Sequence, residues 1–98
     1  NKHRVLEEVN VTQGLLNKSL VHPREVFARA VEARAAALVC VHNHPSGDPS
    51  PSRADRELTK RLATASTLLQ VEFLDHLIIG RPSLRNEGYF SFKEAGLL

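Results

Sequence analysis

Residues 36–55 read AALVCVHNHPSGDPSPSRAD, and this stretch decides the fold. The apolar run at 36–41 is short and continuous, which is typical of a strand buried on both faces in a sheet that helices cover. Residues 43–51 hold three of the five prolines and one glycine. No helix or paired strand can persist through them, so they predict a rigid loop.

Amphipathic helices are predicted on both sides of this stretch. The first runs from about Pro23 to Ala35, because a proline suits the first helical turn and Glu25 lies near the positive end of the helix dipole. The second follows the loop, and its apolar positions recur at spacings of four, three and four residues: Leu58, Leu62, Ala65 and Leu69.

Three more segments complete the pattern. Strands are predicted over Arg4 to Thr12, Val71 to Ile79 and Tyr89 to Phe92, with a turn region from Gly80 to Gly88. Strands interleaved with two amphipathic helices predict an α/β fold, in which helices pack against a mixed β-sheet.

Composition narrows the class of protein. A chain of 98 residues with 42% hydrophobic content suits one globular domain, residues 1–98, and excludes intrinsic disorder. A net charge of +2 is too weak to imply nucleic-acid binding by itself. With one cysteine, no signal segment and no apolar run long enough for a bilayer, the expected setting is cytoplasmic, without a membrane partner. Because it has no methionine and begins abruptly, we interpret the chain as an N-terminally truncated fragment of a longer protein.

A candidate metal site arises where the apolar strand meets the loop. Side chains alternate along an extended chain, so Cys40, His42 and His44 point to one side. Asp55 lies three residues before Leu58 and therefore heads the buried stripe of the second helix. Two histidines and one aspartate are ligands that zinc accepts, and the fourth position would be open to water, as in a catalytic site.

Each part of this site also has an ordinary structural interpretation. Ser52 and Asp55 have the spacing of a capping box, and a single histidine beside a loop usually forms structural hydrogen bonds. Cys40 shares the histidine face, but we assign it to the core, because a free cysteine in an apolar strand usually acts as a small buried hydrophobe.

The motif resembles a known signature. His42-x-His44, seven residues, Ser52, two residues and Asp55 match the JAMM signature of the MPN (JAB) metalloproteases. The string HNHPSGDPSPSRAD resembles the bacterial RadC branch of that superfamily. Other segments agree with it: VHPREVF at 21–27, LDHLIIG at 74–80 and YFSFKEAG at 89–96. The resemblance implies a JAB fold, similar to the cytidine-deaminase arrangement, with Zn²⁺ on His42, His44 and Asp55.

The resemblance also implies a reaction. In the family, the metal lowers the pKa of its water, a glutamate removes the proton, and the serine at the position of Ser52 helps to stabilise the oxyanion. Hydrolysis of a peptide or isopeptide bond in a protein or peptide substrate is expected. The glutamate is expected upstream of Asn1, so the fragment should lack its general base; Glu7, Glu8 and Glu25 are not assigned to that role.

Rival functions differ in how well the residues fit them. A deaminase needs H-x-E followed by P-C-x-x-C, which excludes that chemistry here, and the letters His-Asn-His match the HNH nucleases only by coincidence. A non-catalytic, DNA-repair-associated or DNA-binding accessory module is the alternative, because the RadC family carries a DNA-repair label. The second helix also has basic residues on its polar side: Arg53, Arg56, Lys60 and Arg61. Glu57 interrupts this row, and such residues are most often only solvated.

Asp75 and His76 are the last polar pair. By alternation, one of them should face the core. We expect a buried histidine there to hold a neighbouring loop by hydrogen bonds, with support of the metal site as the alternative.

Overall fold

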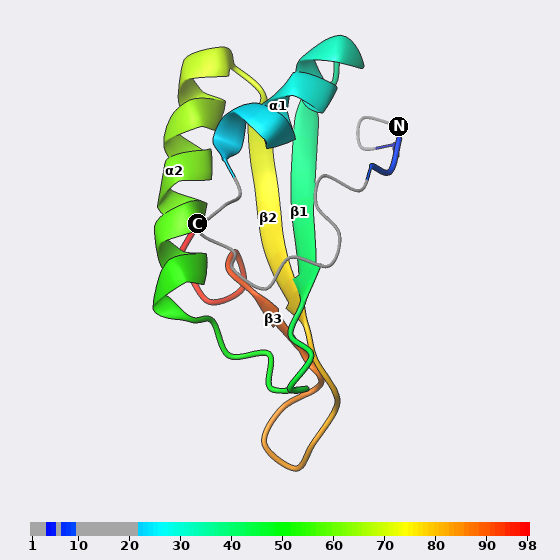
Figure 1. Ribbon diagram of the computed structural model, residues 1–98, viewed down its shortest axis with the longest axis vertical. Helices are drawn as coiled ribbons and strands as arrows, with labels where there is room; N and C mark the ends of the chain where they lie inside the picture. The colour runs from blue at the N-terminus through cyan, green and yellow to red at the C-terminus, as the bar shows by residue number, and fades with distance from the viewer. Residues whose placement is uncertain (1–3, 6, 10–21) are drawn as a thin grey trace.

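The structure is a computed structural model that describes residues 4, 5, 7–9 and 22–98. Its elements follow in the order α1 (Pro23–Glu32), β1 (Ala37–Asn43), α2 (Arg53–Leu69), β2 (Glu72–Ile79) and β3 (Tyr89–Ser91), shown in Figure 1. Residues 6 and 10–12 of the strand predicted from Arg4 to Thr12 lie outside the described residues. Those that are described there, 4, 5 and 7–9, form no strand.

The sheet is mixed, as predicted. Its strand order is β1-β2-β3, with β1 parallel to β2 and β2 antiparallel to β3. Helix α2 forms the crossover between the two parallel strands, so the end of β1 and the start of α2 lie at the same edge of the sheet (Figure 1). The α/β fold class expected for a JAB domain is confirmed.

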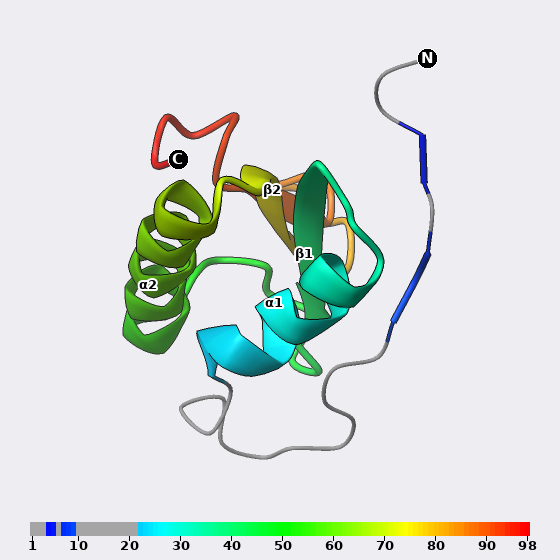
Figure 2. The same ribbon diagram turned by 90° about the horizontal axis from the view of Figure 1, so that it is seen from above.

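Both helices pack on one face of the sheet (Figure 2). The core there is formed by Phe27 and Ala30 of α1 with Leu62 of α2, all at most 8% exposed. The sheet meets them with Leu38 and Cys40. Burial of this apolar surface is the main force that holds α2, and hence Asp55 in its first turn, against the strands.

The opposite face of β1 is not covered by any described residue. Val39 and Val41 are 46% and 59% exposed. The expectation that the apolar run is buried on both faces is therefore wrong for the described part of the chain. The physical reason is that α1 and α2 share one face, so only alternate residues of β1 enter the core.

Strands β2 and β3 each differ from their predicted bounds by one residue, and larger differences occur in α1 and β1. Helix α1 ends at Glu32, not at Ala35, because Arg34 adopts a left-handed conformation with φ 53° and the Ala35 N–H bonds the Ala30 carbonyl. Strand β1 continues through Asn43, and the His44 N–H still bonds the Ile79 carbonyl at 2.9 Å. Extended geometry therefore reaches both histidines.

The helices are short relative to a bilayer. Among the described residues, no helix is long and apolar enough to span a membrane.

Candidate metal centre

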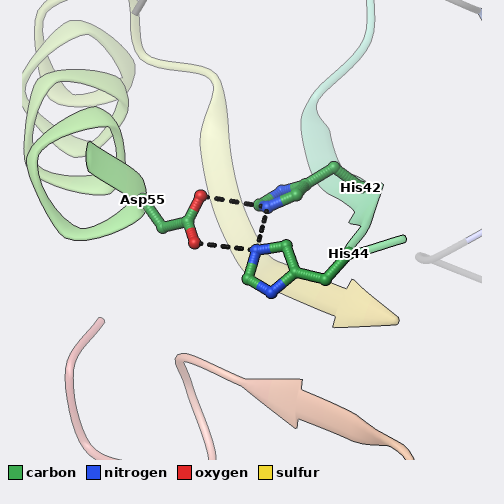
Figure 3. Close-up of side chains that lie close together, drawn as sticks. All are labelled: His42, His44 and Asp55. Carbon is green, nitrogen blue, oxygen red and sulfur yellow. Dashed lines mark hydrogen bonds and ion pairs between the residues drawn. The ribbon is translucent and has the colours of Figure 1, made fainter. Parts of the chain in front are cut away.

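The three predicted ligands meet at the edge of the sheet. His42 belongs to β1, His44 follows it by one residue, and Asp55 is the third residue of α2. Figure 3 shows both imidazoles and the carboxylate directed at one point. The histidines share a side because the strand alternation persists to His44, and α2 supplies the carboxylate because its apolar stripe packs on the same face.

The ligand atoms are close enough to share one ion. His42 Nε2 lies 3.0 Å from Asp55 Oδ1, and His44 Nε2 lies 3.0 Å from Asp55 Oδ2. The two Nε2 atoms are 3.3 Å apart. Tetrahedral zinc with ligands at about 2.0–2.1 Å separates neighbouring ligand atoms by roughly 3.3 Å, so this donor set fits the metal in chemistry and in spacing.

The Asp55 carboxylate is buried and therefore needs partners that compensate its charge. Asp55 is 1% exposed, and a buried carboxylate is costly unless cations or hydrogen-bond donors compensate its charge. Its Oδ2 accepts from the Ser52 N–H at 2.8 Å, and its backbone N–H donates to Ser52 Oγ at 3.0 Å. The predicted capping box is therefore present, and the same carboxylate faces the histidines. The capping and ligand interpretations are compatible.

The loop sets the orientation of His44. Its Nδ1 lies 2.8 Å from the Asp48 carbonyl oxygen, which can only accept, so Nδ1 carries the proton. The lone pair of the neutral ring is then on Nε2, the atom that faces Asp55. A carbonyl behind a histidine ligand is a common way to select the metal-binding nitrogen.

The loop is itself held by the segment that follows β2. The Arg81 N–H bonds the Gly47 carbonyl at 2.7 Å, and the Arg81 guanidinium donates to the Ser46 carbonyl at 3.0 Å. Gly80 lies so close to this loop that a Cβ on it would fall 2.3 Å from the Gly47 carbonyl oxygen. The glycine at position 80 therefore allows the loop to lie this close to the segment after β2.

Cys40 is partly buried against the core, in agreement with its assignment as a small hydrophobe. It packs against the hydrophobic cluster, and burial raises the pKa of its thiol to about 12. A neutral thiol is a poor metal ligand, since the thiolate is the form that binds metal.

Asp75 and His76 have separate roles, and the structure corrects the expectation for the histidine. Asp75 accepts hydrogen bonds from the Ser91 hydroxyl and from the Lys93 N–H, so the aspartate is the residue that secures a neighbouring turn. His76 is 1% exposed, and its Nε2 lies 2.9 Å from His42 Nδ1. Its side chain therefore contacts a predicted ligand, as in the alternative, and not a neighbouring loop.

A register shift explains this arrangement. Leu38 pairs with Phe73, but Val39 pairs with Asp75, so Leu74 is an extra residue in β2. Without it, strict alternation would turn Asp75 toward the helices and His76 away from them. Sequence reasoning had no signal for this irregularity, which therefore hid the role of His76.

The basic residues of α2 are exposed, in agreement with a solvated helix face. Arg53 forms an exposed ion pair with Glu57, Nε to Oε1 3.1 Å. The same row carries Arg56, Lys60 and Arg61. Glu25 lies in the first turn of α1, in the helix-dipole role expected for it.

A mixed sheet with helices packed on it, and with two histidines and an aspartate at the edge where β1 meets α2, is the arrangement of a JAB-type domain. The sequence profile of the RadC-like JAB domain matches residues 1–97, and the chain belongs to this family. Among its relatives, a UPF0758 protein of Trichlorobacter lovleyi is 55% identical over 97 residues, which are 99% of this chain. A UPF0758 protein of Geobacter sulfurreducens is 52% identical over 98 residues, again 99% of this chain. The chain spans about 40% of the length of these relatives.

Proposed function

We propose that this domain is a JAMM-type zinc metallohydrolase centre that cleaves peptide or isopeptide bonds. The observation that supports it is the convergence of His42 Nε2, His44 Nε2 and a fully buried Asp55 carboxylate, with separations of 3.0–3.3 Å. A structural zinc site would normally use four protein ligands, whereas three leave a position for water or substrate.

The proposed roles follow from the contacts of each side chain. His42, His44 and Asp55 would hold the ion. Zinc bound there would supply a water of lowered pKa and a Lewis acid for the substrate carbonyl. Ser52 Oγ already accepts from the Asp55 N–H, so its own proton is available for the oxyanion that forms during hydrolysis. A glutamate that takes up the proton of the water belongs to the proposal, and we assign no described acid to it.

Zinc content is the first test. The purified protein should contain one zinc per chain, and His44→Ala should lose it. His22→Ala is the matched control, because His22 is an exposed histidine that precedes α1 and makes no capping bond with its side chain. Equal zinc content in His44→Ala and His22→Ala would refute the site.

Hydrolysis needs a separate test. A panel of peptide and isopeptide substrates should be offered to a protein of the length of the relatives and to this chain alone. We expect zinc-dependent cleavage by the former, and weaker zinc binding without cleavage by the latter. Cleavage by this chain that His44→Ala abolishes would show that an acid within it serves as the base.

An accessory role in DNA binding is the second candidate, and the exposed row of Arg53, Arg56, Lys60 and Arg61 on α2 is the feature that favours it. A duplex-DNA titration by fluorescence anisotropy at two salt concentrations separates the two functions. Salt-sensitive binding that is lost in Lys60→Glu/Arg61→Glu would support the DNA role. Equal signals from the wild type and this double variant would exclude it for these residues.

A further inference from the structure

We propose that Thr59 and His76 are positioning residues that select the metal-binding tautomer of His42. The inference rests on the zinc site proposed above and assigns a role to two buried residues outside the ligand set. Thr59 is 3% exposed and His76 1% exposed. Through three contacts, they connect the Asp55 backbone carbonyl to His42 Nδ1, the ring nitrogen that does not face Asp55.

The chain of contacts starts at the backbone of α2. Thr59 Oγ1 lies 2.8 Å from the Asp55 carbonyl oxygen and 2.6 Å from His76 Nδ1. His76 Nε2 in turn lies 2.9 Å from His42 Nδ1. Stacking of the His76 ring on Phe92, with centroids 4.8 Å apart and an angle of 9° between the ring planes, holds the ring in this orientation.

The two contacts of the Thr59 hydroxyl point to one assignment of the protons. The Asp55 carbonyl can only accept, and two oxygens 2.8 Å apart need a hydrogen between them, so the Thr59 hydroxyl donates there. A hydroxyl has one proton; His76 Nδ1 must therefore supply the proton for its own contact with Thr59 Oγ1. Neutral His76 then accepts at Nε2, so the proton between the rings belongs to His42 Nδ1.

This assignment determines the state of His42 Nε2, the nitrogen on the other side of the ring. With its proton on Nδ1, a neutral His42 has its lone pair on Nε2, which lies 3.0 Å from Asp55 Oδ1 and 3.3 Å from His44 Nε2. Both histidines then carry their proton on Nδ1. The Asp48 carbonyl selects this tautomer in His44, and the Thr59–His76 pair selects it in His42. The register shift in β2 is what gives His42 this partner, because it turns His76 to the same face as Cys40.

Nitrogen-15 NMR of the metal-free protein near pH 8 tests the assignment directly. His76 should be found as the Nδ1–H tautomer. Thr59→Val removes the hydroxyl at nearly constant volume and should shift His76 toward Nε2–H, whereas Thr59→Ser should retain the wild-type tautomer. A wild-type His76 with its proton on Nε2 would overturn the proposal.

Zinc affinity, measured by competition with a chromophoric chelator, tests the effect on the site. His76→Phe keeps a ring for Phe92 and leaves the Thr59–Asp55 contact in place; we expect its zinc dissociation constant to rise about 10- to 100-fold. Thr59→Val should also weaken zinc binding, whereas Thr59→Ser, which keeps the hydroxyl, should retain the wild-type affinity. If both residues act through His42, the double variant Thr59→Val/His76→Phe should bind zinc no more weakly than His76→Phe.

These results separate the relay from the zinc site. A wild type that binds no zinc refutes the metal centre, while the tautomer of His76 still decides whether the hydrogen-bond order is correct. Wild-type affinity in His76→Phe, or fully additive losses in the double variant, would overturn the positioning role. Denaturant melts of each variant identify any change that comes from unfolding.

Discussion

At the residue scale, the Ser52 hydroxyl has two roles to be tested, as the cap of α2 and as a donor to the oxyanion. Its oxygen accepts from the Asp55 N–H and so caps α2. Replacement by alanine should lower the free energy of unfolding by about 1 kcal/mol, while glycine should largely retain capping. If the hydroxyl also donates to the oxyanion, Ser52→Ala and Ser52→Gly should both lower kcat by roughly 10²-fold in a protein of full length. Normal turnover by the alanine variant, with reduced stability alone, would limit Ser52 to a helix cap.

Cys40 is predicted to be chemically inert in the folded protein. Burial raises the pKa of its thiol from 9.0 to about 12, so the thiolate fraction near neutral pH falls by about a thousandfold. A thiol reagent at pH 8 should therefore react at least a hundredfold more slowly with the native protein than with the urea-unfolded chain. Equal rates would contradict the burial of this side chain.

The same shift makes a prediction about pH and stability. Because the pKa is raised in the folded state, burial of the neutral thiol contributes stability that is present below pH 9 and is lost as the pH rises toward about 12. Between pH 8 and pH 10, the wild type should lose about 1 kcal/mol more than Cys40→Ala. Denaturant melts of both proteins at the two pH values measure the difference; parallel losses would exclude it.

At the element scale, the loop between β1 and α2 owes its position to the segment after β2. A Cβ at Gly80 would lie 2.3 Å from the Gly47 carbonyl oxygen, and backbone cannot move away cheaply. Gly80→Ala should therefore destabilise the fold by about 1–3 kcal/mol and, by displacing the loop that orients His44, weaken zinc binding. Leu84→Ala is the matched control, because Leu84 is fully exposed on the same segment. Thermal melts and chelator competition should separate the two variants, and identical behaviour would refute the role of this contact.

At the scale of the whole molecule, one ion would join three parts of the chain: β1, the loop after it and α2. Zinc held by these parts would bind the native state in preference to the unfolded chain, so a concentration 100-fold above the dissociation constant should raise the free energy of unfolding by about 2.7 kcal/mol. A chelator should reverse the effect, and acid should weaken it, because the histidine ligands must be deprotonated. Melts with and without zinc measure it, and the same increase in His44→Ala would show that the ion binds elsewhere.

Much of the site could be predicted from the sequence, because its geometry is local. Strand alternation places His42 and His44 on one side, the helical repeat aligns Asp55 with Leu58, and the prolines of 43–51 demand a loop between them. The mixed α/β fold followed from the same periodicities. These features depend on backbone geometry within a few residues, which the amino-acid order specifies directly.

Only the tertiary structure decided which face of β1 is covered and which residue of β2 reaches the site. Burial on both faces was expected, but both helices pack on one side and leave Val39 and Val41 exposed. One extra residue, Leu74, reverses the alternation of β2 and brings His76, in place of Asp75, against His42. Pairing register and helix placement depend on contacts between segments far apart in the chain, so no local repeat in the sequence records them.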